Sequence, residues 1–315
     1  MATTEPAIPV ELEASEPGRP ASRSWSERII EGLIKLCGIS AVVIITLIFL
    51  FLIKEGVPAF REIRIAQMLT SRWYPIEGMY GIVPLLVGSL LVTVLAIIIA
   101  VPLGLVTAVY LGEFAPPWQR EILKPLIEVL AGIPSIVLGF FGWLVLAPLI
   151  QSLGAPSGLT AFTGGIILAY MTLPTIISIT EDALYAVPKE YRDGSLAIGA
   201  TQWQTIWRVV IPAARSGIVI AVMLGLGRAF GETMLVLLVT GNAANIPELG
   251  LDIFFQPVRT MTATIASEMG EVAQGSLHYS VLFAIGIILF LITAAINSLA
   301  THLVGGGKRR RGSQI

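Results

Sequence analysis

The sequence predicts an all-α protein that crosses a membrane with six transmembrane helices. Of its 315 residues, 55% are hydrophobic and only 13% are charged, whereas soluble domains carry about a quarter charged residues. The mean hydropathy is +0.83, and long apolar runs separate the few charges. This composition argues against a soluble globular enzyme.

Five runs with little charge mark the spans, since a helix needs about 20 apolar residues to cross about 30 Å of hydrocarbon. The third run is too long for one helix, and the turn-rich stretch 154–158 divides it into two spans. The fourth run continues past two charges. In order, the runs cover residues 36–53, 78–112, 129–180, 216–247 and 272–307.

Lysine and arginine are unevenly distributed between the two sides of the predicted bundle. With the N-terminus inside, 14 of the 20 basic residues lie on the cytoplasmic side and five on the outer side. Because cytoplasmic loops of membrane proteins are enriched in these residues, both termini are predicted to be cytoplasmic.

The chain is expected to divide into a tail, a first helix, a core and a second tail. The N-terminal tail is rich in Pro, Glu, Ala and Ser, which predicts disorder, and it lacks the pattern of a signal peptide. The two outer segments are long enough to dock a soluble partner, or they are only connectors. The expected parts are 1–26 (disordered cytoplasmic tail), 27–80 (first helix and outer segment), 81–307 (five-helix core with cytoplasmic loop 181–215 and outer loop 242–271) and 308–315 (basic cytoplasmic tail).

Charge and cysteine content exclude several other functions. The formal net charge of -1 gives no electrostatic reason to expect nucleic acid as a partner. Cys37 is the single cysteine, so no disulfide forms within the chain, and His278 and His302 are too far apart in sequence for metal-ligand spacing. No metal or other cofactor is expected in this chain.

The cytoplasmic loop 181–215 is predicted to form two short helices. Pro188 suits the first turn of the first helix, and Gly199 suits a left-handed C-terminal cap after Ile198. Thr201 and Gln204 have the spacing of a capping box that begins the second helix, and Pro212 is expected to end it.

The second of these helices has one apolar face. Trp203, Ile206, Trp207 and Val210 follow the i, i+3, i+4, i+7 spacing of a helix. Other apolar groups must cover this face, either from the protein's own spans or from a partner.

The same loop resembles the cytoplasmic "EAA" signature of ABC importer permeases. Asp193-Gly194-Ser195, then Gly199, then the run 209–212 (Val-Val-Ile-Pro) match its spacing, although the first triplet departs from Glu-Ala-Ala. The resemblance implies a type I (MetI-like) permease fold in which the loop 186–212 couples to a separate ATP-binding subunit. The residues that would dock there are Tyr191, Arg192, Asp193, Gly194, Ser195, Ala197, Gly199 and Ala200.

The chain lacks the G-x-x-x-x-G-K-[ST] phosphate loop, since Gly307-Lys308 is followed by Arg309. We therefore expect a non-catalytic subunit, with ATP and magnesium bound by a partner chain.

Arg228 and Glu232 interrupt the fifth apolar span. Four residues apart on a helix, they would share a face, and a charge at mid-membrane costs about 2.5 to 3.5 kcal/mol. A planar guanidinium suits the oxygens of an oxyanion, so Arg228 is predicted to line a translocation path, with Glu232 holding it in place. A purely structural neutralising pair is the alternative.

Three motifs together resemble the permease subunits of phosphate-specific (Pst) ABC importers. They are 227–234 (GRAFGETM), 130–135 (LAGIPS) and 265–271 (IASEMGE), and Glu232-Thr233-Met234 favours the PstC type over PstA. The resemblance implies substrate-path residues Arg228, Glu232 and Thr233, and location in a bacterial inner membrane. It also implies as partners phosphate, a PstA-like second permease, a PstB-like ATP-binding dimer and a PstS-like extracytoplasmic phosphate-binding protein. The alternatives are a permease for sulfate or molybdate, or a secondary transporter or channel.

Overall fold

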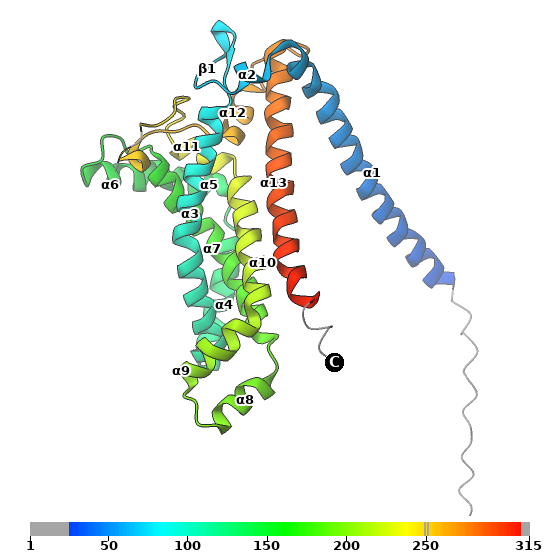
Figure 1. Cartoon of the computed structure of the whole chain (residues 1–315), viewed down its shortest axis with the longest axis vertical. Coiled ribbons are helices and arrows are strands. Elements are labelled where there is room, and N and C mark those ends of the chain that lie inside the picture. The colour runs from blue at the N-terminus through cyan, green and yellow to red at the C-terminus, as the bar shows by residue number, and fades with distance from the viewer. Residues whose placement is uncertain (1–24, 249, 251, 310–315) are drawn as a thin grey trace, which may run out of the picture. The chain divides into compact units, whose positions relative to one another are not determined.

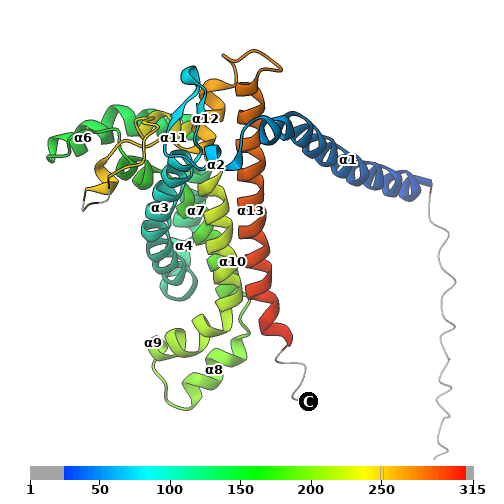
Figure 2. The same ribbon diagram turned by 45° about the horizontal axis from the view of Figure 1, so that its top comes forward.

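The computed structural model describes residues 25–248, 250 and 252–309 (Figures 1 and 2). Within these residues, six helices are long and apolar enough to cross a membrane, so the predicted number of spans and the all-α class are confirmed. The six spans are Trp25–Glu62, Val83–Phe114, Ser135–Ser152, Ala161–Tyr185, Gln202–Phe230 and Leu277–His302.

Several of these spans are built from more than one helical segment. The second joins α3 (Val83–Val109) to a π-helix (Tyr110–Phe114), and the fifth joins α9 (Gln202–Thr205) to α10 (Ile211–Phe230) through the π-helix Ile206–Val210. The third comprises α5 (Ser135–Phe141), a π-helix (Gly142–Leu146) and α6 (Ala147–Ser152). The remaining spans are α1 (Trp25–Glu62), α7 (Ala161–Tyr185) and the first part of α13 (Leu277–Arg309).

Shorter elements connect the spans. β1 (Trp73–Tyr74) and β2 (Met79–Tyr80) form an antiparallel hairpin in which Trp73 lies opposite Tyr80. The other elements are α2 (Ile65–Met68), the 3-10 helix Pro75–Glu77, α4 (Pro117–Ala131), α8 (Lys189–Ala197), α11 (Met234–Val239), the 3-10 helix Ile253–Phe255 and α12 (Met261–Glu268).

The chain forms two compact units that meet within α1, one up to Phe51 and one from Leu52 onward. In the described part of the first unit, nearly all side chains are exposed, including large apolar ones such as Ile39 and Ile45. A helix with apolar side chains all round is typical of a membrane span.

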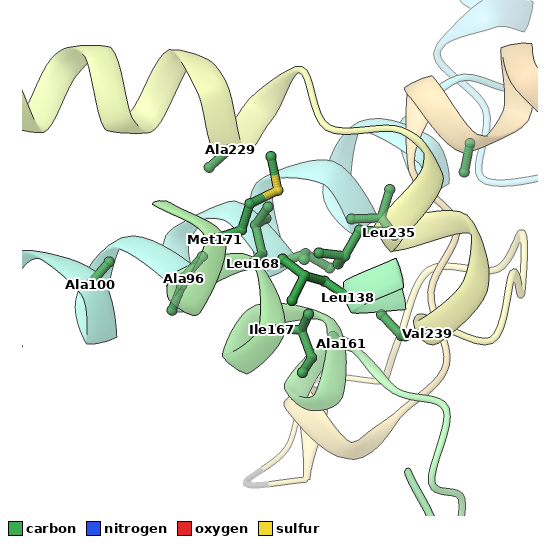
Figure 3. Close-up of a cluster of buried hydrophobic side chains, with 14 of the residues drawn as sticks. Ala96, Ala100, Leu138, Ala161, Ile167, Leu168, Met171, Ala229, Leu235 and Val239 are labelled. Atoms are coloured by element: carbon green, nitrogen blue, oxygen red, sulfur yellow. The ribbon is translucent and has the colours of Figure 1, made fainter. Parts of the chain in front are cut away.

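The core of the second unit lies where α3, α7, α10 and α11 meet (Figure 3). Ala96 and Ala100 of α3 face Leu168 and Met171 of α7 in this cluster. Small residues bring the helices close together: a Cβ atom added at Gly225 would lie 2.8 Å from the Ile176 side chain. Such close approach is how helices associate where lipid removes the hydrophobic driving force.

The second unit has two distinct ends (Figures 1 and 2). The α8 end carries α8, α9 and the C-terminal end of α7, whereas the hairpin end carries β1, β2 and α12. The expected cytoplasmic loop and the expected outer segments therefore lie at opposite ends of the helices, as six spans require.

The bounds of the third and fifth spans differ from the predicted runs for identifiable reasons. The third span begins at Ser135 instead of residue 129, because Pro134 has extended backbone (φ -57°, ψ 134°) and separates α4 from α5. The fifth span begins at Gln202 and ends at Phe230, and α11 follows as a separate helix.

The predicted tails fall mainly outside the described residues. Residues 1–24 and 310–315 are not described, whereas Trp25 and Ser26, expected in the tail, already belong to α1. Lys308 and Arg309 belong to α13.

Pro212 does not end the second loop helix, and this prediction is wrong. The helix continues through Pro212 without a break. Pro212 is the second residue of α10, which follows the π-helix Ile206–Val210. Pro lacks a backbone N–H and disrupts the hydrogen bonds of an ordinary helix. The wider i→i+5 turns of the preceding π-helix re-register these bonds just before the proline.

Candidate functional site

The predicted bend between α8 and α9 is confirmed in its local detail. Gly199 has φ +87°, in the left-handed region that favours glycine, and nothing lies within 4 Å of where its Cβ would be. The Thr201 Oγ1 accepts a hydrogen bond from the Gln204 backbone N–H (3.3 Å), and the Gln204 side chain accepts one from the Thr201 N–H (3.0 Å). Two helices thus meet at a sharp, capped corner.

The residues expected to dock onto an ATP-binding subunit divide into two groups. Ser195 and Ala200 are half-buried, and the Ser195 and Thr205 hydroxyls lie 2.9 Å apart, which ties α8 to α9. Arg192 is half-buried as well, and its guanidinium contacts Glu113 of the second span. The exposed residues are Tyr191, Asp193, Gly194, Ala197 and Gly199.

The apolar face of the second loop helix is only half covered. Ile206 and Val210 are buried in a cluster with the ends of α3 and α7, whereas Trp203 and Trp207 are 59% and 47% exposed. The chain's own spans therefore cover the aliphatic residues and leave the two indoles exposed.

Arg228 and Glu232 do not share a helical face, so this prediction is wrong. α10 ends at Phe230 with Gly231 as its C-cap, which places Glu232 and Thr233 in a link before α11. The Glu232 carboxylate accepts a hydrogen bond from the Leu235 backbone N–H (3.4 Å), and no ion pair joins Glu232 to Arg228, although the structure describes both residues.

Arg228 is held by a different residue, which the sequence did not indicate. Its Nη1 donates a hydrogen bond to the Thr175 Oγ1 of α7 (3.1 Å). Thr175 lies fourteen residues from one end of α7 and ten from the other, which is about 21 Å and 15 Å at 1.5 Å per residue. The guanidinium thus lies beside the middle of α7, although Arg228 itself is two residues from the end of α10.

The exposed face of α10 that leads to Arg228 is apolar. Ile220 and Leu224 precede Arg228 at four-residue intervals on α10, and all three side chains are exposed. Residues spaced by four lie on one face of a helix. A single charge therefore lies on an exposed apolar stripe at membrane depth, where an unpaired charge is costly.

Hydroxyl groups gather beside Glu232, a feature that sequence reasoning missed. Glu232 and Ser89, Thr93, Thr260 and Thr262 surround one narrow space, too small for a water molecule, where α3, α7, α10, α11 and α12 meet. The Thr262 Oγ1 donates to the Glu232 carbonyl (2.7 Å), and Ser89 Oγ accepts from the Met261 N–H (2.9 Å). The alternating threonines at 260, 262 and 264 were the available signal.

At the hairpin end, Glu268 joins three segments of the chain. Its Oε1 accepts a hydrogen bond from Trp73 Nε1 (3.0 Å) and forms an ion pair with Arg259 Nη1 (2.9 Å), and its second oxygen lies 2.8 Å from His278 Nε2. Desolvation, with a smaller contribution from the nearby Glu268 charge, raises the pKa of the Tyr80 phenol above its ordinary value. This network links the hairpin, α12 and α13.

The arrangement of the spans has the fold of the type I ABC importer permeases. The structure is similar to a chain of a bacterial alginate ABC transporter solved with an alginate-bound periplasmic protein. The TM-score is 0.59 with 16% identity, and the match covers 89% of this chain and 96% of that chain. At this identity the likeness concerns the fold.

Sequence comparison then identifies the family. Residues 100–306 match the binding-protein-dependent transport system inner membrane component family, and the chain belongs to this family. It is 39% identical to the probable ABC transporter permease protein YqgH of Bacillus subtilis (86% of this chain, 88% of that protein). It is 36% identical to the phosphate transport system permease protein PstC of Pasteurella multocida (76% of this chain, 79% of that protein).

Membership of this family has direct consequences. The chain is a multi-pass inner membrane protein and a non-catalytic subunit, since ATP is hydrolysed by a separate chain. It works with an ATP-binding subunit, a second permease and a binding protein. A secondary transporter or channel, one of the alternatives left open by the sequence, is thereby excluded.

Proposed function

We propose that this chain is the PstC-type permease subunit of an ATP-driven phosphate importer and forms half of its translocation path. The observation that carries the proposal is Arg228, whose guanidinium is hydrogen-bonded to Thr175 near the middle of α7, in a chain 36% identical to a phosphate transport permease over 260 residues. A guanidinium keeps its charge in a desolvated setting and offers paired N–H donors to phosphate oxygens.

In this proposal, Arg228, Glu232 and Thr233 belong to the path. Thr175 positions the guanidinium with one hydrogen bond and leaves its other donors available to an anion. Glu232 stays off the helix that carries Arg228, so its charge does not neutralise the guanidinium through an ion pair. The exposed stripe of α10 faces the second, PstA-like permease across the path.

The α8 end is the coupling site in this proposal and lies in the cytoplasm with both termini. The exposed residues Tyr191, Asp193, Gly194, Ala197 and Gly199 dock onto a PstB-like ATP-binding dimer. The hairpin end then lies outside and receives a PstS-like binding protein. The cytoplasmic bias of lysine and arginine supports this orientation.

A permease for another oxyanion is the second candidate, because a guanidinium also suits sulfate or molybdate. One similar protein, YqgH, carries no substrate in its name. Uptake measurements separate the candidates.

The test uses liposomes that contain the complete complex, with ATP on the side of the ATP-binding subunit and labelled anion with the binding protein on the other. Phosphate, sulfate and molybdate are compared for wild type, Arg228→Gln and Arg228→Lys. Arg215→Gln is the matched control, since Arg215 is an exposed arginine on the same helix.

We expect phosphate uptake to fall at least tenfold in Arg228→Gln and less in Arg228→Lys, with the control unchanged and all complexes assembled. Wild-type uptake of sulfate or molybdate without phosphate would overturn the substrate. Normal uptake by Arg228→Gln would show that this arginine is structural.

A further inference from the structure

A charged pair ties α8 to the end of the second span. Arg192 of α8 and Glu113 of the π-helix Tyr110–Phe114 form an ion pair with an Nη2–Oε1 distance of 2.7 Å and an Nε–Oε2 distance of 3.3 Å. The side chains are only 22% and 9% exposed. Two parallel hydrogen bonds between a guanidinium and a carboxylate fix both distance and orientation.

The same guanidinium also holds the end of α7. Its Nη1 donates to the Val187 carbonyl (2.6 Å) and its Nη2 to the Leu184 carbonyl (2.8 Å). These carbonyls lie where α7 ends and the regular i→i+4 hydrogen bonds stop; the Leu184 carbonyl also accepts a hydrogen bond from the Val187 N–H (3.2 Å). Arg192 thus connects α3, α7 and α8 through one rigid group.

Further contacts link the same point to α9. Gln202 Nε2 donates to the Glu113 carbonyl (3.2 Å), and the Phe114 and Trp203 rings lie 6.2 Å apart. Since α9 continues into α10 without a break, both helices at the Gly199 corner are tied to the end of the second span.

The end of the second span, which carries Glu113, also forms hydrogen bonds with α4. Arg120 of α4 donates from Nε and Nη2 to the Leu111 carbonyl (2.9 and 2.6 Å) and from Nη2 to the Gly112 carbonyl (2.9 Å). The end of the second span that carries Glu113 is therefore hydrogen-bonded to α4 as well as to α8.

We propose that Glu113 and Arg192 are a positioning pair that transmits movement of α8 to the second and fourth spans. Arg192 acts within the permease, and the exposed Tyr191 and Asp193 on either side of it remain for the ATP-binding subunit. The inference rests on the proposed coupling role of α8 and adds the route by which that role reaches the spans. It replaces the docking role that the sequence suggested for Arg192.

The chemistry explains why the pair suits transmission. A buried ion pair contributes little net stability, because desolvation offsets the attraction, but removal of one partner leaves an unpaired charge. An arginine satisfies the carboxylate and two carbonyls at once through its planar set of donors, which a lysine does not reproduce. The main effect of the pair is therefore to fix the distance and orientation between α8 and the second span.

The test measures ATP hydrolysis and anion uptake in the reconstituted complex and compares their ratio. The variants are Glu113→Gln, which keeps the shape of the side chain, Arg192→Lys and Arg192→Gln. Glu190→Gln is the matched control, because Glu190 is an exposed carboxylate on α8. Co-purification of the ATP-binding subunit reports docking separately.

We expect each pair variant to bind the ATP-binding subunit as wild type does, yet to import at least fivefold less anion per ATP hydrolysed. Stimulation of ATP hydrolysis by the loaded binding protein should fall in parallel, with the control unchanged. Gln202→Ala removes the exposed hydrogen bond to the Glu113 carbonyl. This variant should lower the anion imported per ATP hydrolysed and the stimulation of ATP hydrolysis as well, but by less than the pair variants. It provides the test if the pair variants do not assemble.

An unchanged uptake-to-ATP ratio in Glu113→Gln would overturn the inference. So would loss of the ATP-binding subunit in Arg192→Gln but not in Glu113→Gln, since Arg192 would then be a docking residue. The ratio uses whichever anion the wild type imports, so failure of the phosphate assignment is seen separately, in wild-type uptake.

Discussion

Glu268→Gln should loosen the hairpin end of the molecule. Glu268 accepts a hydrogen bond from Trp73, forms an ion pair with Arg259 and lies 2.8 Å from His278. The substitution keeps one acceptor oxygen and removes the negative charge. Arg259 then remains as a largely buried cation, with a side chain 17% exposed and an Nε atom that has no hydrogen-bond partner.

The expected magnitude follows from this geometry. Removing one partner of a buried ion pair costs about 3 to 5 kcal/mol, and a hydrogen bond to a charged group contributes about 1.5 to 3 kcal/mol. The side chains here are 15 to 22% exposed, so water partly solvates the remaining charge and the retained amide oxygen still accepts a bond. We therefore expect a loss of about 2 to 3 kcal/mol in local stability.

Amide hydrogen exchange of the hairpin measures this loss directly, because local opening sets the exchange rate. A loss of about 2 to 3 kcal/mol corresponds to about 30- to 150-fold faster exchange at one tenfold step per 1.4 kcal/mol. Glu271→Gln is the control, since that exposed side chain lies three residues away. Equal exchange in the two variants would refute the reasoning.

Two further predictions concern other elements. Tyr80, outside the membrane-spanning helices, should titrate above its usual value of 10.0, seen as the absorbance difference from Tyr80→Phe. Because the pKa of Tyr80 is raised in the folded state, the contribution of Tyr80 to stability is present below pH 10 and is lost as the pH rises through the raised pKa. In Glu268→Gln the titration midpoint of Tyr80 should fall but stay above 10.0. A fall to 10.0 would contradict desolvation as the main cause of the raised pKa. Gly225→Ala should lower the free energy of unfolding, followed by thermal denaturation in detergent, by about 1 to 3 kcal/mol, because the added methyl group overpacks against Ile176. Gly227→Ala is the control, since its added atom meets nothing closer than 3.9 Å. Equal losses in the two variants would show that packing is not the cause.

Local features of the coupling loop could be predicted because their interactions are local. The capping box joins Thr201 to Gln204, three residues away, and the left-handed turn at Gly199 depends on its own backbone. The number of spans follows equally from apolar run length. Helix continuity was harder to predict, since Pro212 and Gly231 both suggest an end and only Gly231 marks one.

Tertiary structure alone decided which partners the charged side chains bind. Arg192 binds Glu113 across 79 positions, Arg228 binds Thr175 across 53, and Trp73 binds Glu268 across 195. Helical periodicity reports only which residues share a face of one helix, so it paired Arg228 with Glu232. The resemblance to the permease signature likewise placed Arg192 among the docking residues by its position in the loop alone. The sequence by itself determined a six-span membrane protein with a capped loop at one end. The packing of α3, α7 and α10 determined the partners, because the close approach of those helices sets which side chains are within hydrogen-bonding distance.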